Sequence, residues 1–155
     1  MQGSASLHIN ASIDRVWSLV SDVTRIGSFS PETFEAEWLN GATASQVGVQ
    51  FRGHVKRNGI GPVYWDLCEI TDCVPNELFA FKVTFRGATA NTWGYRLAEE
   101  DGGTLLTEFF ALPRTLGTRI YWSLFGRARG KTNQEGMMTT LVRMREVLEG
   151  PGSAP

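Results

Sequence analysis

The feature that most constrains the fold is an amphipathic stretch near the end of the chain. Apolar side chains recur there with the spacing of one helical face, at Met137, Leu141, Met144 and Leu148. The charged residues of the same stretch lie off this stripe. The sequence therefore predicts a helix that packs by one face on the remainder of the protein.

Toward the N-terminus the same stripe meets only small or polar residues, Asn133, Gly130 and Gly126. If the helix is continuous from Leu116 to Glu149, its second half fills a core and its first half leaves space for a ligand cavity. Each interior glycine costs about 1 kcal/mol relative to alanine, which favours a functional reason for their presence. The alternative is a helix that breaks near Gly130, with only its later part regular.

Upstream of this stretch, apolar residues alternate in the manner of β-strands. The expected strands cover residues 4–10, 34–38, 47–55, 63–73, 79–85, 93–97 and 105–112, and two short helices are expected at 13–20 and 22–26. Turn signals separate the strands at Asn40-Gly41, Asn58-Gly59, Pro75-Asn76 and residues 100–103. Short turns make a sheet antiparallel, and only the C-terminal helix is long enough to cover it. We therefore predict an α+β fold, with a curved antiparallel sheet of about seven strands wrapped around a long C-terminal helix.

Length and composition favour one domain, predicted over residues 1–150, with a disordered tail at 151–155. The net charge of −1 and the lack of a basic block argue against nucleic acid as a partner. No signal peptide and no long apolar run are apparent. Cys68 and Cys73 would lie too far apart along one strand for a disulfide, which indicates two reduced thiols. Together these features predict a cytoplasmic protein.

Known catalytic motifs are missing from the sequence. There is no nucleophile elbow, no His-Glu-x-x-His, no Cys-x-x-Cys and no phosphate-binding glycine loop. The two histidines, His8 and His54, lie far apart. We therefore predict neither a metal site nor a cofactor.

Aromatic residues give the stronger indication of a binding site. Phe79, Phe81, Phe85, Trp93 and Tyr95 are expected on the concave face of neighbouring strands. They form either plain core or, with the small residues of the helix, an apolar pocket for a planar or isoprenoid-like molecule. The predicted ligand-binding set is Phe51, Trp65, Phe79, Phe81, Phe85, Trp93, Tyr95, Phe109, Ile120, Leu124, Gly126, Gly130 and Asn133.

A few polar residues are candidates for proton transfer. His54 is expected on the opposite face from its apolar neighbours, as a surface histidine or as an acid or base at the cavity mouth. Glu108 lies in a strand with apolar residues on both faces, so it points either to solvent or into the interior, where burial would raise its pKa. Asp66 and Glu69 fall on opposite faces of one strand, and either one can face inward.

The element order and several residues resemble the START-like or SRPBCC superfamily, also called Bet v 1-like or helix-grip proteins. Within it, the polyketide cyclase/dehydrase and lipid-transport group is the most similar. The matching segments are Ile13-Asp14-Arg15-Val16-Trp17, Ser30-Pro31, Phe51-Arg52-Gly53, Trp65, Phe79-Ala80-Phe81, Trp93-Gly94-Tyr95, Gly103-Thr104, Thr107-Glu108 and the helix from Gly136 to Glu149. The resemblance implies the helix-grip fold but does not identify a ligand.

Three functions are compatible with this resemblance. The first is binding or transport of a small hydrophobic molecule such as a lipid, a polyketide or an isoprenoid. The second is a polyketide aromatase/cyclase or dehydratase that uses one or two polar cavity residues, and the third is a protein-interaction module. The apolar cluster of residues 120–125 is expected to be core, a dimer contact or a lid for transient membrane contact. The protein is accordingly a monomer or a homodimer.

Overall fold

The structure is a computed structural model that describes residues 2–56, 61–113 and 116–150, with the backbone alone at 116–132. The elements in chain order are β1 (Gln2–Ile9), α1 (Ile13–Val20), the 3-10 helix η1 (Val23–Ser28), β2 (Thr33–Trp38), β3 (Gln50–Val55), β4 (Tyr64–Val74), β5 (Leu78–Phe85), β6 (Ala88–Glu100), β7 (Gly103–Ala111) and α2 (Leu116–Glu149). This order confirms the predicted arrangement of one strand, two short helices, six strands and one long helix.

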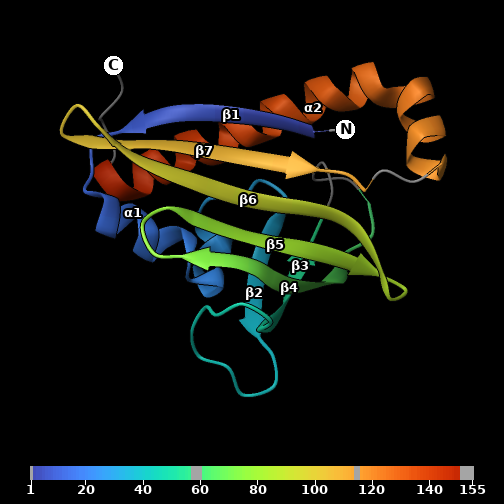
Figure 1. Ribbon diagram of the computed structural model, residues 1–155, viewed down its shortest axis with the longest axis horizontal. Helices are drawn as coiled ribbons and strands as arrows, with labels where there is room; N and C mark the ends of the chain where they lie inside the picture. Colours follow the sequence, from blue (N-terminus) through green and yellow to red (C-terminus); the bar gives the residue numbers. More distant parts are fainter. Residues whose placement is uncertain (1, 57–60, 114–115, 151–155) are drawn as a thin grey trace.

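All neighbouring strands pair antiparallel in a seven-stranded sheet of order β1-β7-β6-β5-β4-β3-β2. Figure 1 shows the sheet curling, with α2 running along β1 and β7. The predicted helix-grip fold is therefore confirmed. The tight turn between β6 and β7 follows from its sequence, because Asp101 and Gly102 both take positive φ angles, 47° and 78°, as a two-residue hairpin turn requires.

The C-terminal part of α2 is fixed on the core by its apolar stripe. Met137, Leu141, Met144 and Leu148 are all buried, as the spacing predicts. Polar contacts hold the end of the helix in addition: Arg15 donates to the carbonyl of Leu148 at 2.7 Å, and the Glu149 carboxylate accepts from the Asn10 amide at 2.5 Å. A cation at the last carbonyls also complements the helix dipole.

The helix does not end at its glycines. α2 is one helical element from Leu116 to Glu149, so the alternative of a break near Gly130 is wrong. Its first turns are set at an angle to the remaining turns (Figure 1). The predicted tail at 151–155 and the Asn58-Gly59 turn lie outside the described residues.

Every strand differs from its predicted range by at least one residue, and two of these differences have a local cause. β3 begins at Gln50 rather than at residue 47, because Gly48 takes a φ of 86° that interrupts extended backbone. β6 covers Ala88–Glu100 rather than 93–97, since its first residues include Thr89 and Asn91, which carry no apolar alternation to reveal a strand.

Two glycines allow a matched test of this packing. A Cβ at Gly94 would lie 2.7 Å from the Phe79 carbonyl oxygen and 2.8 Å from the Ala80 Cβ, whereas a Cβ at Gly136 would meet nothing within 4 Å. We expect Gly94→Ala to lower the free energy of unfolding by roughly 1–3 kcal/mol through overpacking. Gly136→Ala should raise it by about 1 kcal/mol through helix propensity. Urea denaturation of both variants checks the opposite signs, and equal effects would contradict this packing.

Candidate functional site

A cavity of about 610 Å³ lies between the inner face of the sheet, the segment after η1 and the middle of α2. Its walls combine apolar and aromatic side chains with a smaller number of polar groups. Its lining residues are Ile26, Ser30, Pro31, Glu32, Thr33, Phe51, Gly53, Val55, Asp66, Cys68, Phe81, Val83, Ala90, Asn91, Trp93, Tyr95, Glu108, Phe110, Leu112, Asn133, Glu135, Gly136, Met137, Thr139 and Thr140. The size and composition are those of a small-molecule site.

Exposed lining residues locate the mouth of this cavity. Pro31, Glu135 and Thr139 are exposed, whereas most lining residues on the inner strands are buried. Ser30 stabilises the segment at the mouth, because its hydroxyl oxygen accepts from the amide of Thr33 at 2.9 Å. A ligand would thus enter between this segment and α2.

Glu108 is the buried carboxyl group of the cavity. In β7 the alternate residues Leu106, Glu108 and Phe110 are buried, so the strand turns the carboxyl inward, and only 6% of Glu108 is exposed. Its Oε1 accepts a hydrogen bond from the Tyr95 hydroxyl at 3.4 Å, and its Oε2 has no partner. Tyr95 and Glu108 are directly paired across β6 and β7, which explains their proximity.

Burial controls the protonation of this pair. Desolvation raises the pKa of Glu108 to about 8, although the hydroxyls of Tyr95 and Thr140 act in the opposite direction. Desolvation also raises the pKa of Tyr95 well above its ordinary value, and the neighbouring carboxylate adds to that effect. At neutral pH Glu108 is therefore mainly a neutral acid, able to donate a proton or a hydrogen bond into the cavity.

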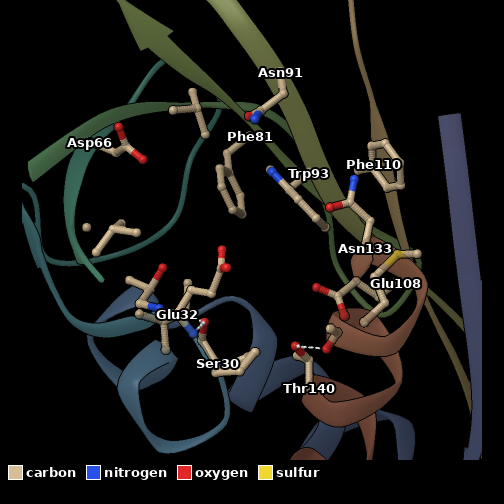
Figure 2. Close-up of a pocket in the computed structure, with 18 of the residues that line it drawn as sticks. Ser30, Glu32, Asp66, Phe81, Asn91, Trp93, Glu108, Phe110, Asn133 and Thr140 are labelled. Atoms are coloured by element: carbon tan, nitrogen blue, oxygen red, sulfur yellow. Dashed lines mark hydrogen bonds between the residues drawn. The ribbon is translucent and has the colours of Figure 1, made fainter. Parts of the chain in front are cut away.

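The inner face of β6 supplies further polar groups. Asn91, Trp93 and Tyr95 alternate on this face and all line the cavity. Figure 2 shows Asn91 and Glu108 at different ends of the lining, with Trp93 and Asn133 between them. The side-chain oxygen of Asn91 is buried and without a partner, like Oε2 of Glu108.

Several residues of the predicted site do lie together. The lining includes Phe51, Phe81, Trp93, Tyr95, Asn133 and Glu108. Phe51 and Phe81 are in edge contact, with ring centroids 5.2 Å apart. The sequence did not determine which of the two β4 carboxylates, Asp66 or Glu69, faces inward. Asp66 lines the cavity, while Glu69 forms an ion pair with Lys82 at 2.7 Å.

Other residues predicted for the cavity lie elsewhere. Trp65 and His54 stack on each other with centroids 4.2 Å apart, and Arg52 covers the Trp65 ring from 4.4 Å. This outward stack and the 3.2 Å contact from His54 to Glu35 place His54 away from the cavity lining, so the prediction of an acid or base at the mouth is wrong.

Two further aromatic residues that were predicted for the cavity lie outside its lining for structural reasons. Phe85 is 64% exposed, because it is the last residue of β5 and lies next to the turn into β6, outside the cavity lining. Phe109 lies under the guanidinium of Arg96, since an inward Glu108 turns its neighbour outward.

Phe79 is buried but belongs to the core, where it meets Trp17, and it does not line the cavity. For Ile120, Leu124, Gly126 and Gly130 the structure describes the backbone alone, as part of α2, so their predicted place in the site stays a prediction.

Sequence reasoning missed several lining residues. Asn91 could have been found, because it continues the alternation of Trp93 and Tyr95 by one step. Thr140 lies beside the stripe residue Leu141, and its hydroxyl donates to the Gly136 carbonyl, but nothing in the sequence distinguishes it. Ser30 and Glu32 lie in a connecting segment whose course follows no periodicity.

The described residues were also compared with the requirements for a metal site, a membrane-spanning helix and a disulfide. Within these ranges, no group of three or more His, Cys, Asp or Glu side chains is placed to bind a metal ion. A helix with the length and apolar character to cross a membrane is likewise not found among them. Cys68 and Cys73 are free thiols, and burial raises the pKa of both.

A comparison with known protein families shows to which family the chain belongs. The family model described as "Polyketide cyclase / dehydrase and lipid transport" matches residues 2–149. The chain belongs to this family. A comparison with curated protein sequences gave no significant match.

Solved structures with the same fold include the Polyketide_cyc-like protein Cgl2372 from Corynebacterium glutamicum. It is 26% identical, with a TM-score of 0.58 over 96% of this chain and 91% of that chain. The Aha1 dimer from Colwellia psychrerythraea is 11% identical, with a TM-score of 0.64 over 99% of both chains.

DynU16, from the dynemicin biosynthetic locus, is 17% identical, with a TM-score of 0.63 over 96% of this chain and 47% of DynU16. At these identities DynU16 and Aha1 show the fold alone.

The raised pKa of Glu108 predicts a pH-dependent stability for this family member. Because the folded pKa is about 8 and the ordinary value 4.5, the unfolded chain releases this proton first as pH rises. The free energy of unfolding should therefore fall between about pH 4.5 and 8, and Glu108→Gln should remove that loss. We expect the advantage of the variant to grow by roughly 3 kcal/mol from pH 5 to pH 8.

Urea denaturation at several pH values measures this difference. Glu99→Gln, which removes an exposed carboxylate from β6, controls for the loss of one negative charge. A wild-type and a Glu108→Gln protein whose stabilities change in parallel with pH would contradict the buried, neutral state of Glu108.

Proposed function

We propose that this protein binds a small hydrophobic ligand, of lipid, polyketide or isoprenoid type, in the cavity between the sheet and α2. The observation that carries the proposal is the 610 Å³ cavity, whose walls include Phe51, Phe81 and Trp93. Cavities of roughly 300–1,000 Å³ with apolar walls and few polar groups are typical of small-molecule sites. The family, whose description names polyketide cyclases, dehydrases and lipid transport, supports the same class of ligand.

The combination of apolar and polar residues on the cavity walls indicates how such a ligand would be held. Burial of about 300 Å² of apolar ligand surface contributes roughly 7 kcal/mol before the costs of association. That term is insensitive to the ligand's detailed structure, whereas the polar groups on the walls favour particular functional groups. We therefore assign affinity mainly to the aromatic walls and selectivity to Asn91, Tyr95 and Glu108.

A variant that fills the cavity tests ligand binding directly. Gly136 lines the cavity and has open space where a side chain would begin, whereas Met138, on the same helix, is 38% exposed and outside the lining. Gly136→Phe should weaken binding of the neutral dye Nile red at least tenfold, because the ring occupies the ligand's space. Met138→Phe should bind as the wild type does.

Fluorescence titration measures both affinities, and circular dichroism confirms that each variant is folded. A wild type that does not bind the dye, or a Gly136→Phe variant that binds it normally, would contradict the proposed cavity function.

A second candidate function is dehydration or cyclisation of a bound polyketide, and the inward carboxyl of Glu108 favours it. In a dehydration, neutral Glu108 would donate its proton to the hydroxyl of a β-hydroxy carbonyl compound. The C–O bond then breaks and water leaves. The Glu108 carboxylate next accepts a proton from the adjacent carbon, whose C–H electron pair forms the C=C bond. Tyr95, 3.4 Å from the carboxyl, is placed to orient it.

This candidate predicts a rate that depends on neutral Glu108. With a β-hydroxyacyl thioester that carries a phenyl group, Glu108→Gln should lower the rate of water loss by about 10²–10⁴, the usual contribution of a general acid or base. The wild-type rate should fall as pH rises above about 8, because the acid form is lost. Chromatography of the unsaturated product checks both. Wild-type protein that forms no product above the buffer rate would leave the binding function alone.

Other features are consistent with these proposals. An unfilled cavity is less expected for the third alternative, a protein-interaction module. The two free thiols support a cytoplasmic location, and a family match over residues 2–149 supports one domain over 1–150. The Aha1 dimer shows that this fold occurs in dimers, and for this chain we propose a monomer or a homodimer.

A further inference from the structure

Two oxygen atoms on the cavity wall are buried without a hydrogen-bond partner. Among the residues that the structure describes, three buried side-chain polar atoms have none, namely Asn91 Oδ1, Glu108 Oε2 and Arg145 Nε. The first two belong to residues that line the cavity, and Glu108 is 94% buried. Buried polar atoms in native proteins nearly always have a partner, so an unpartnered atom that faces a cavity indicates a missing ligand or water.

The two residues that carry these oxygens lie apart along the sheet, and their backbone separation follows from the strand register. Asn91 lies four residues before Tyr95 on β6, which is about 13 Å of strand, and Tyr95 is paired directly with Glu108. Trp93 lies between them on the same face and packs against Phe110, with centroids 5.3 Å apart. Figure 2 shows this arrangement, with Asn91 and Glu108 at different ends and both Trp93 and Asn133 between them.

From this geometry we propose that the ligand is an elongated molecule with a rigid apolar frame, a hydroxyl at one end and a hydroxyl or carbonyl oxygen at the other. One hydroxyl donates to Asn91 Oδ1, while the oxygen at the other end hydrogen-bonds the Glu108 carboxyl, and the frame lies along Trp93. With about 2.8 Å for each hydrogen bond, the ligand's two oxygens are roughly 8–13 Å apart.

This inference rests on the proposed binding function and narrows it. A ligand with one polar end, such as a simple fatty alcohol, leaves one of the two wall oxygens without a partner. Water molecules are the competing explanation, because a cavity with polar groups can hold ordered water. The two explanations differ in whether a second oxygen on the ligand improves its affinity.

The experiment compares estradiol with two analogues that each lack one of its hydroxyls. Estradiol carries hydroxyls at opposite ends of a rigid apolar frame, and competition with Nile red measures all three affinities. We expect estradiol to bind about tenfold more tightly than either analogue. Asn91→Leu should remove its advantage over one analogue, and Glu108→Leu its advantage over the other. Thr92→Leu, at a neighbouring β6 position outside the lining, should leave both advantages intact.

The outcomes separate this inference from the function on which it rests. Wild-type protein that does not bind Nile red contradicts the cavity function itself. Nile red binding combined with equal affinities for the three steroids, or with no steroid binding, overturns the two-ended ligand alone. An advantage of estradiol that survives both leucine variants also overturns it, because the hydroxyls would then be recognised elsewhere. Thermal unfolding confirms that the leucine variants are folded.

Discussion

The structure depends on the way in which one face of α2 packs on a curved sheet. Its apolar stripe is buried from Met137 to Leu148, and Arg15 fixes the far end through the Leu148 carbonyl. Earlier in the same helix Asn133 takes the place of an apolar residue on the stripe, and both Asn133 and Gly136 line the cavity. The helix is therefore anchored by its second half, and small side chains in its middle leave space above the sheet. One packing contact thus accounts for both the core and the cavity.

The buried carboxyl of Glu108 lowers the stability of the folded chain at neutral pH. At neutral pH, keeping this group neutral in the folded state costs roughly 3 kcal/mol relative to the ionised unfolded chain. Domains are stable by only about 5–15 kcal/mol in total, so the cost is substantial. A leucine at this position of β7 would avoid it. The cost is more easily understood if the carboxyl contacts a ligand, since only a polar partner can make full use of Oε2.

Much of the fold could be predicted from the sequence, because alternation and helical spacing are local signals. The stripe of α2, the order of strands and the Asp101-Gly102 turn all follow from residues close together in the chain. Which side chains of β7 face inward could not be predicted in this way. Leu105 and Leu106, like Phe109 and Phe110, place apolar residues on both faces of the strand. Strand pairing settles that direction, and pairing is not local.

The site was less predictable than the fold for the same physical reason. Aromatic residues indicated a pocket, and Phe51, Phe81, Trp93 and Tyr95 do line one.

Phe85 and Trp65 are also aromatic but lie outside, because Phe85 ends its strand and Trp65 stacks on His54. The polar wall residues gave weaker signals still. An asparagine in a strand acquires chemical meaning only when tertiary structure buries its side-chain oxygen without a partner, as for Asn91. For this chain, the unpartnered oxygens therefore restrict the ligand that we propose more than the aromatic residues do, since aromatic walls accept many molecules and a buried polar atom accepts few.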